Sequence, residues 1–103
     1  MEASRRTVAH FDHRSQPDGD WIAISGDFSA EDSVVCDAVF DWAKSANRIV
    51  LDLSGMRFIN VHGMESIVRI RTRAHQSNRT LVIRGGSESV RRALARAGVI
   101  GIP

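Results

Sequence analysis

A short apolar run in the middle of the chain restricts most strongly what this chain can fold into. Segment 48–53 reads RIVLDL and carries branched apolar residues without the polar–apolar alternation of a half-exposed strand. Such a run is typical of a central strand that is covered on both faces. With 103 residues, the chain has room for one core around that strand. We therefore expect one domain over residues 1–103, with residues 1–6 flexible.

The other segments alternate between strand and helix patterns. Further strands are predicted at 7–12, 21–25 and 80–84, with turn residues at 15–19 and the start of a last strand at 99–100. Three segments carry apolar residues at helical spacing: Val35, Ala38, Val39 and Trp42; Met64, Ile67, Val68, Ile70 and Ala74; Val90, Ala93, Leu94 and Ala97. The order β-β-α-β-α-β-α predicts a two-layer α/β domain. We expect a mixed sheet of four to five strands, with helices packed mainly on one face.

Capping residues mark the ends of two predicted helices. Ser29 is placed to cap the first helix, which carries Glu31 in its first turn and ends near Ser45. Ser87 is placed to cap the last helix. Gly98 follows that helix at the position where a left-handed residue is common.

The charges are unevenly distributed along the chain. Residues 1–52 carry ten acids and five bases, whereas residues 53–103 carry nine arginines and two acids. An arginine-rich half could follow the phosphates of a nucleic acid, but single-strand binders also place aromatic side chains among the bases. None occurs after Phe58. Solvated outer faces of helices are the main interpretation, and nucleic-acid binding is kept as a minor hypothesis.

No motif for catalysis or metal binding emerges from the sequence. The four histidines lack a second ligand pair at zinc spacing, and the one cysteine, Cys36, lies among acids that disfavour its thiolate. The glycines of GGSES, 85–89, lack the lysine and the spacing of a phosphate-binding loop. We therefore expect no enzyme, no cofactor and no metal site.

Membrane and export signals are not evident either. The first twenty residues lack the apolar core of a signal peptide. No apolar run reaches the roughly 20 residues of a membrane span. We expect a cytoplasmic protein without a membrane span.

Three segments together resemble the STAS family of anti-anti-sigma factors: WIAISGDF (21–28), RIVLDLSGMRFINVHGMESIVRIRTRA (48–74) and TLVIRGGSESVRRALARAGV (80–99). The resemblance covers roughly residues 7–100. Its most specific parts are the segment DLSG at 52–55, Phe58, Gly63 and the helix over 90–98. It implies a regulatory binding domain that docks on an anti-sigma factor of the serine-kinase type and so releases a sigma factor for transcription.

The resemblance also implies a contact surface. In the family, the kinase phosphorylates a serine in an Asp-Ser-Ser/Thr-Gly segment at the start of the second helix. That aspartate falls on Asn60, the phospho-acceptor on Val61 and the next hydroxyl residue on His62, while Gly63 is kept. The resemblance therefore implies a chain without a phospho-acceptor at this position, and we expect residues 1–103 to lack the final helix of many members. The expected partner-binding loop and adjoining helix side comprise Asn60, Val61, His62, Gly63, Met64, Glu65 and Arg69.

Several alternatives remain open. The domain could be an accessory or scaffold subunit of a sensory assembly or of a lipid-transport ATPase, as related domains are. Val61 could also fill a gap in the core that a serine leaves open. Cys36 and Phe40 lie away from the apolar stripe of the first helix, which predicts a second interface and a homodimer. Alternatively, Phe40 packs against the N-terminal segment.

Overall fold

The computed structural model describes residues 9–17, 19–28, 35–43 and 47–100, and five strands and three helices lie within them. The elements are β1 (His10–Gln16), β2 (Gly19–Phe28), α1 (Val35–Trp42), β3 (Arg48–Asp52), β4 (Met56–Ile59), α2 (Val61–Gln76), β5 (Thr80–Arg84) and α3 (Glu88–Arg96). They follow one another in the predicted order, with β4 added between β3 and α2.

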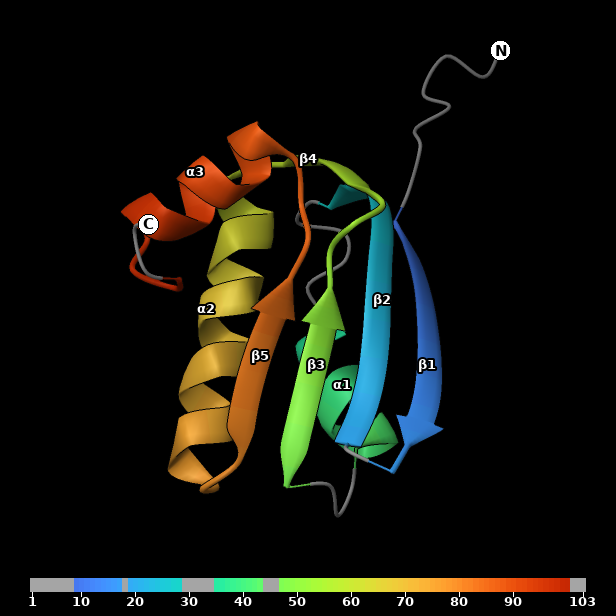
Figure 1. Cartoon of the computed structure of the whole chain (residues 1–103). Coiled ribbons are helices and arrows are strands. Elements are labelled where there is room, and N and C mark those ends of the chain that lie inside the picture. The colour runs from blue at the N-terminus through green and yellow to red at the C-terminus, as the bar shows by residue number, and fades with distance from the viewer. Residues whose placement is uncertain (1–8, 18, 29–34, 44–46, 101–103) are drawn as a thin grey trace, which may run out of the picture.

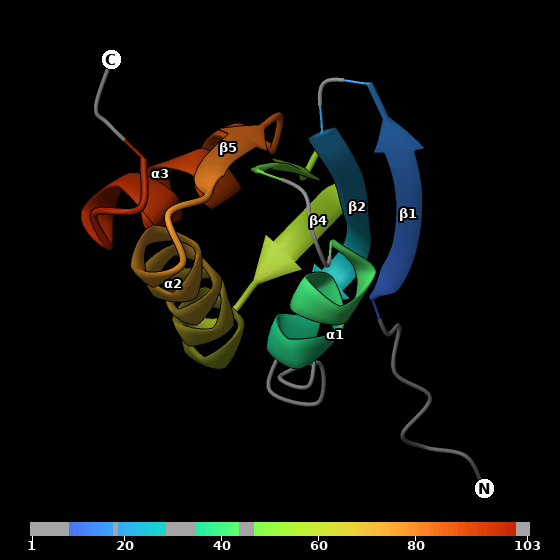
Figure 2. The ribbon, with the colours of Figure 1, turned by 90° about the horizontal axis from the view of Figure 1, so that it is seen from below.

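The strands form one mixed sheet in the order β1-β2-β3-β5 (Figure 1). The β1–β2 pair is antiparallel, and β2–β3 and β3–β5 are parallel. The short strand β4 runs parallel to the end of β2, beyond the residues that pair with β3. Helices α1 and α2 cover one face of the sheet, and α3 lies beside β5 and α2 (Figure 2). The predicted two-layer fold is confirmed.

The core lies between the sheet and the helices. Alternate residues of the central strands point into it, namely Ile22 and Ile24 of β2 and Ile49 and Leu51 of β3. They meet apolar side chains of the helices, all of them buried: Val39, Ala43, Ile67, Ile70, Ala74, Val90 and Leu94. Part of each predicted stripe therefore supplies the core, whereas Ala97 is exposed and the buried Ala43, just after α1, was not predicted.

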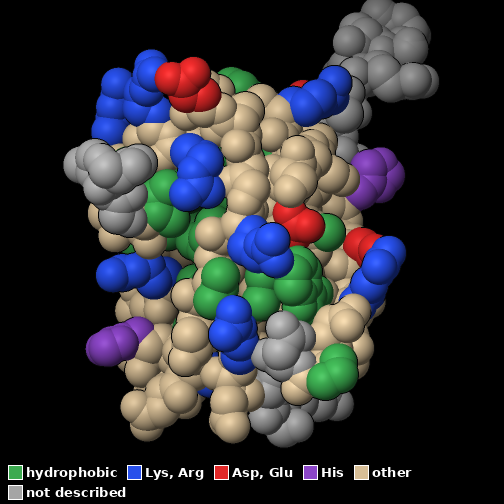
Figure 3. All heavy atoms as spheres, viewed as in Figure 1, with side chains coloured by type: hydrophobic (Ala, Val, Ile, Leu, Met, Phe, Trp, Pro, Cys, Tyr) green, Lys and Arg blue, Asp and Glu red, His purple; other side chains and the backbone are tan. Residues whose placement is uncertain are grey.

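The middle of the run RIVLDL, residues 49–51, is buried on both faces as predicted, whereas Arg48 is exposed and Asp52 half-buried. Val50 is fully buried, yet it is not part of the core between sheet and helices. It points to the opposite face of the sheet, which neither α1 nor α2 covers (Figure 2). Figure 3 shows apolar side chains gathered in the middle of this face, with arginines above and below them.

Several predicted boundaries are wrong. Strand β1 runs to Gln16, through residues expected in the turn, because the Ser15 hydroxyl donates to Asp20 Oδ1 (2.9 Å) across the hairpin. Residues 99–100 form no strand. The Val99 N–H donates a hydrogen bond to Leu94 O (2.9 Å) just after the helix, and the Val99 side chain packs against the core. The expected cap Ser29 lies outside the described residues, as do Glu31 and Ser45.

Candidate interaction site

The loop between β4 and α2 places the most specific segment of the sequence at a helix start. Asn60 is extended (φ −101°, ψ −177°), and its side-chain oxygen accepts a hydrogen bond from Gly63 N–H at 2.8 Å. Asparagine and aspartate cap helices about equally well. The change of the family's aspartate to Asn60 therefore keeps the helix start, and α2 begins at Val61, where the resemblance places the start of the second helix.

Gly63 is buried where α2 crosses the end of β2. A Cβ atom at this position would lie 2.5 Å from the carbonyl oxygen of Phe28 and 3.0 Å from its Cδ2 atom. The Phe28 carbonyl also accepts a hydrogen bond from Asn60 N–H at 3.3 Å. The glycine thus allows the first turn of α2 to lie directly against the β2 backbone, which fixes the direction of the loop.

Two large apolar side chains flank this loop and are exposed to solvent. Phe58 is 54% exposed and Val61 is 65% exposed. No other large apolar side chain of the described residues is exposed. Val61 therefore does not fill a gap in the core, and that alternative is wrong.

A groove of about 350 Å³ lies next to Val61, between the start of α2 and the last turn of α3. Its lining is Ile59, Asn60, Val61, Met64, Ala93, Arg96 and Ala97. These side chains are mostly apolar, and Arg96 is the one charged residue among them. We call the groove, together with the exposed side chains of Phe58 and Val61, the loop surface; Val61 lines the groove, and Phe58 precedes the lining residue Ile59 in β4.

The remaining residues of the predicted site surround this surface. His62 and Glu65 lie one turn apart, with Nδ1 and Oε1 3.7 Å apart, and both side chains are about 60% exposed. Arg69 is exposed and follows Val61 and Glu65 at intervals of four residues, so the three lie on one side of α2. The structure thus brings the predicted site residues together along the first half of α2, with Gly63 alone buried.

Five residues of the loop surface were not predicted from the sequence: Phe58, Ile59, Ala93, Arg96 and Ala97. Phe58 and Ile59 belong to β4, whose four residues carry no alternation that would predict a strand. The other three lie at the end of α3, with Ala97 as its C-cap. Nothing in the sequence places the end of α3 beside the start of α2.

The predicted second interface is not supported at Phe40. Phe40 is 8% exposed, and the guanidinium carbons of Arg73 and Arg79 lie 4.6 and 5.6 Å from its ring centroid. The expectation of an exposed phenylalanine is therefore wrong, because the end of α2 and the following turn cover this side of α1. The side chain of Cys36 lies outside the described part of the chain.

The described residues contain no group of three metal-ligating side chains close enough to hold an ion. None of the helices in that part of the chain combines the length and the apolar character needed to cross a membrane. One carboxyl group is clearly perturbed: Asp52 Oδ1 accepts hydrogen bonds from the Ser54 hydroxyl (2.6 Å) and N–H (3.0 Å). The pKa of Asp52 lies below its usual value of 3.8, mainly because the Ser54 hydroxyl donates to the carboxylate. The positive charge of Arg84 makes a smaller contribution in the same direction. This carboxylate closes the turn after β3.

A five-stranded mixed sheet with two helices on one face, and a capped helix after β4 whose first turn carries a buried glycine, are features of a STAS domain. The model of the family described as "Mlab, STAS domain" matches residues 11–102, and the chain belongs to this family. A comparison with curated proteins found no match.

Two solved structures have the same fold. The NMR structure of the protein TM1081 has a TM-score of 0.75 at 22% identity, and the match covers 87% of this chain and 74% of TM1081. The crystal structure of Mglu has a TM-score of 0.67 at 17% identity over 75% of this chain. The chain spans only 20% of the length of Mglu. The predicted resemblance and fold class are confirmed.

Proposed function

We propose that this STAS domain is a non-catalytic interaction module that binds an anti-sigma factor of the serine-kinase type in the cytoplasm and so regulates transcription. The observation that carries the proposal is the exposure of Phe58 and Val61 at the loop where family members meet their kinase. Burial of one such side chain contributes about 1.5–3 kcal/mol. A partner that covers both, together with the adjoining groove, would gain a compact apolar anchor.

The loop surface supports permanent docking rather than a phosphorylation switch. Val61 has no hydroxyl group, and the hydroxyls nearest in sequence are engaged elsewhere. Ser66 is fully buried and donates to His62 O at 3.3 Å, and Ser54 donates to Asp52. A serine kinase bound to the loop would therefore find no acceptor in it, and the negative charge that separates such complexes would not form.

A second candidate function uses the same surface. The domain would be an accessory or scaffold subunit of a sensory assembly or of a lipid-transport ATPase. The absence of a hydroxyl at position 61 favours this alternative, because a permanent subunit needs no release step. The two candidates differ in the partner and not in the contact.

Nucleic-acid binding through the arginines has less support. On the face shown in Figure 3, the arginines are separated by apolar and uncharged groups rather than joined in a stripe. Arg84 lies over Trp21, Arg91 donates to Gly85 O, and Arg92 pairs with Glu88. Gel retardation of duplex DNA at low salt tests this hypothesis, because each phosphate contact contributes a log–log salt slope of about −0.9. We expect no retardation.

The test of the main proposal is affinity purification from the native cell with mass spectrometry, using the wild-type chain, Phe58→Asp and Val61→Asp. Wild type is expected to recover an ATPase-fold kinase, and each aspartate variant to lose binding by about tenfold or more when affinities are then measured with that purified kinase. Gln76→Asp, at the exposed far end of α2, is the matched control and is expected to bind like wild type. Recovery of ATPase transport subunits would favour the second candidate. Unchanged binding by both aspartate variants would contradict a contact at the loop surface.

A further inference from the structure

The outer edge of β5 carries backbone groups that no described strand pairs. Strand β5 ends the sheet, and among the described residues it pairs with β3 alone. Thr80 N–H donates to Asn47 O, and Arg84 O accepts from Leu53 N–H, both at 2.8 Å. Because successive peptide groups of a strand point to opposite edges, the N–H and C=O groups of Leu81 and Ile83 face outward.

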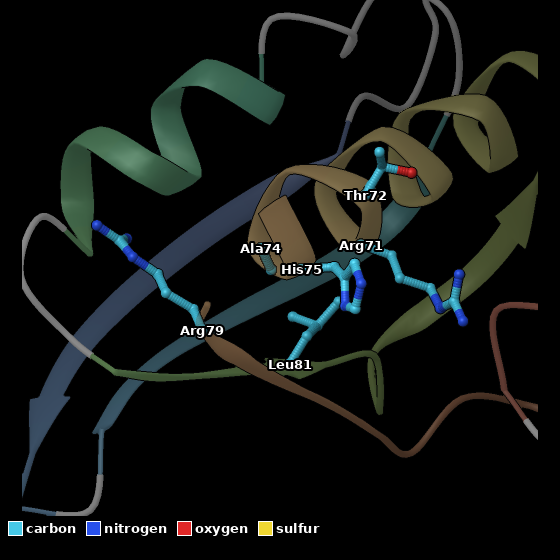
Figure 4. A pocket seen from close by; sticks show the side chains of 6 residues that line it. All are labelled: Arg71, Thr72, Ala74, His75, Arg79 and Leu81. Atoms are coloured by element: carbon cyan, nitrogen blue, oxygen red, sulfur yellow. The ribbon is translucent and has the colours of Figure 1, made fainter. Parts of the chain in front are cut away.

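A groove of about 360 Å³ runs between this edge and the second half of α2. It is lined by Arg71, Thr72, Ala74, His75, Arg79 and Leu81. Figure 4 shows His75 beside Leu81 and Arg71 on the same side of the helix, whereas Arg79 extends toward α1. The Arg79 guanidinium donates to Ala43 O at 2.7 Å, so only its hydrocarbon stem belongs to the groove. The groove thus has an apolar floor and a basic rim.

The charged residues that line this groove have one sign. No carboxylate is among the described residues that line the groove. At the carboxyl end of β5, Arg91 Nη1 donates to Gly85 O at 2.7 Å, which adds a further cation there. The two glutamates of this half of the chain lie elsewhere, since Glu65 is near His62 and Glu88 pairs with Arg92.

We propose that the outer edge of β5 takes up an extended acidic segment of a partner protein as an additional strand. The backbone of the segment pairs with Leu81 and Ile83. Alternate side chains of an added strand point to the helix side of the sheet, where a glutamate can lay its methylene groups on Leu81 and place its carboxylate near Arg71. A second copy of this chain fits less well, because pairing β5 with β5 would bring two basic rims together. This edge is distinct from the loop surface.

The experiment uses the full chain labelled with ¹⁵N and an acetylated, amidated octapeptide in which valine and threonine alternate with glutamate. We expect saturable amide shift changes at Leu81 and Ile83, and slower hydrogen exchange of these two amides. The Val82 amide faces β3 and is an internal control, since its exchange should hardly change. A peptide with lysine in place of glutamate is expected to bind about tenfold more weakly or not at all.

Two charge reversals separate a local contact from the overall charge. Arg71→Glu is expected to lower the affinity for the acidic peptide about tenfold. Arg92→Glu changes the net charge by the same amount and should leave this affinity within about twofold of the wild-type value. Phe58→Asp should bind the peptide like wild type, so failure at this edge is distinguishable from failure at the loop surface.

Four results of the peptide experiments would overturn the inference. They are equal binding of both peptides, equal binding by the two charge variants, shift changes confined to the loop surface, and no change at Leu81 and Ile83. In the last case the basic rim would serve only to keep an edge strand from aggregating. Concentration-dependent protection of Leu81 and Ile83 without peptide would identify a second copy as the occupant and would also overturn it.

Discussion

The guanidinium carbon of Arg84 lies 4.9 Å from the ring centroid of Trp21, although β3 separates the strands that carry the two residues. Val50 pairs in register with Trp21, whereas Arg84 pairs with Asp52, two residues further along β3. The Arg84 side chain therefore reaches diagonally across β3 beside Val50 to meet the Trp21 ring. This arrangement explains why Val50 is fully buried on a face without a helix. Arginine can cover apolar surface with its hydrocarbon stem while its charged end stacks on an aromatic ring.

Replacement of Arg84 should reduce the stability of the fold. Arg84→Ala removes the stem over Val50 and the stacking on Trp21, and we expect a loss of about 1–2 kcal/mol in the free energy of unfolding. Arg92→Ala, which removes an exposed helix arginine paired with Glu88, should cost less than about 0.5 kcal/mol. Urea unfolding followed by circular dichroism measures both. Equal losses in the two variants would mean that Arg84 does not cover Val50.

A methyl group at Gly63 should damage the start of α2. In Gly63→Ala the added Cβ meets the Phe28 carbonyl oxygen, a backbone atom that cannot move aside without shifting β2. We expect a loss of about 1–3 kcal/mol in the free energy of unfolding. Gly98→Asn is the comparison variant. Gly98 has φ +75°, and a Cβ atom added there would have no other atom within 4 Å. Asparagine tolerates this conformation, so the loss should stay below about 1 kcal/mol. Thermal or urea unfolding of both variants tests the comparison, and a tolerated Gly63→Ala would contradict the close packing.

The turn after β3 should make stability depend on pH in the acid range. The pKa of Asp52 in the folded chain lies below its usual value of 3.8, mainly because of the Ser54 hydroxyl. A depressed carboxyl pKa stabilises the folded state above the unfolded pKa, and this stabilisation is lost as the pH falls through the folded pKa. We therefore expect the wild-type chain to lose more stability between pH 5 and pH 2 (roughly the range that such a group spans) than Asp52→Asn does.

An NMR titration of the Asp52 carboxyl group checks the cause directly. Ser54→Ala removes the hydroxyl donor and keeps the backbone N–H donor, so the carboxyl pKa should rise toward its usual value in this variant. An Asp52 carboxyl that titrates identically in wild type and Ser54→Ala would show that the hydroxyl does not stabilise the charge.

The ends of α3 were predictable from the sequence, because each end depends on residues that are close together along the chain. Ser87 caps α3 as expected, with its hydroxyl oxygen accepting from Val90 N–H at 3.3 Å. Gly98 has φ +75°, and Gly98 and Val99 N–H groups return to the carbonyls of Ala95 and Leu94. This is the paired closure of a helix end that a glycine in this position favours.

Features that depend on distant parts of the chain were not predictable. Strand β4 exists because it pairs with the end of β2, and its own four residues carry no strand pattern. The burial of Phe40 depends on Arg73 and Arg79, more than 30 residues away along the chain. The groove of the loop surface likewise needs α3 beside α2. Periodicity indicates which side of a helix is apolar, but it does not indicate which element will cover the other side.

Restoring the family pattern in the loop should create the missing switch. In Asn60→Asp/Val61→Ser, the aspartate should cap α2 as Asn60 does, and the new serine should take the position of a side chain that is 65% exposed. We therefore expect normal folding, together with phosphorylation by a cognate serine kinase. The phosphate would add about −1.5 to −2 charges at an apolar contact and weaken the complex. Mass spectrometry after incubation with that kinase and ATP, followed by a binding measurement, tests both steps.

Wild type and Val61→Ala are the controls for this experiment. Neither has a hydroxyl at position 61, so both should keep their mass and their complex in the presence of ATP. Val61→Ala should bind somewhat more weakly, because it buries less apolar area in the contact. Stoichiometric phosphate on the wild-type loop would contradict permanent docking. A doubly substituted chain that is phosphorylated yet stays bound would show that charge at this position does not control the complex.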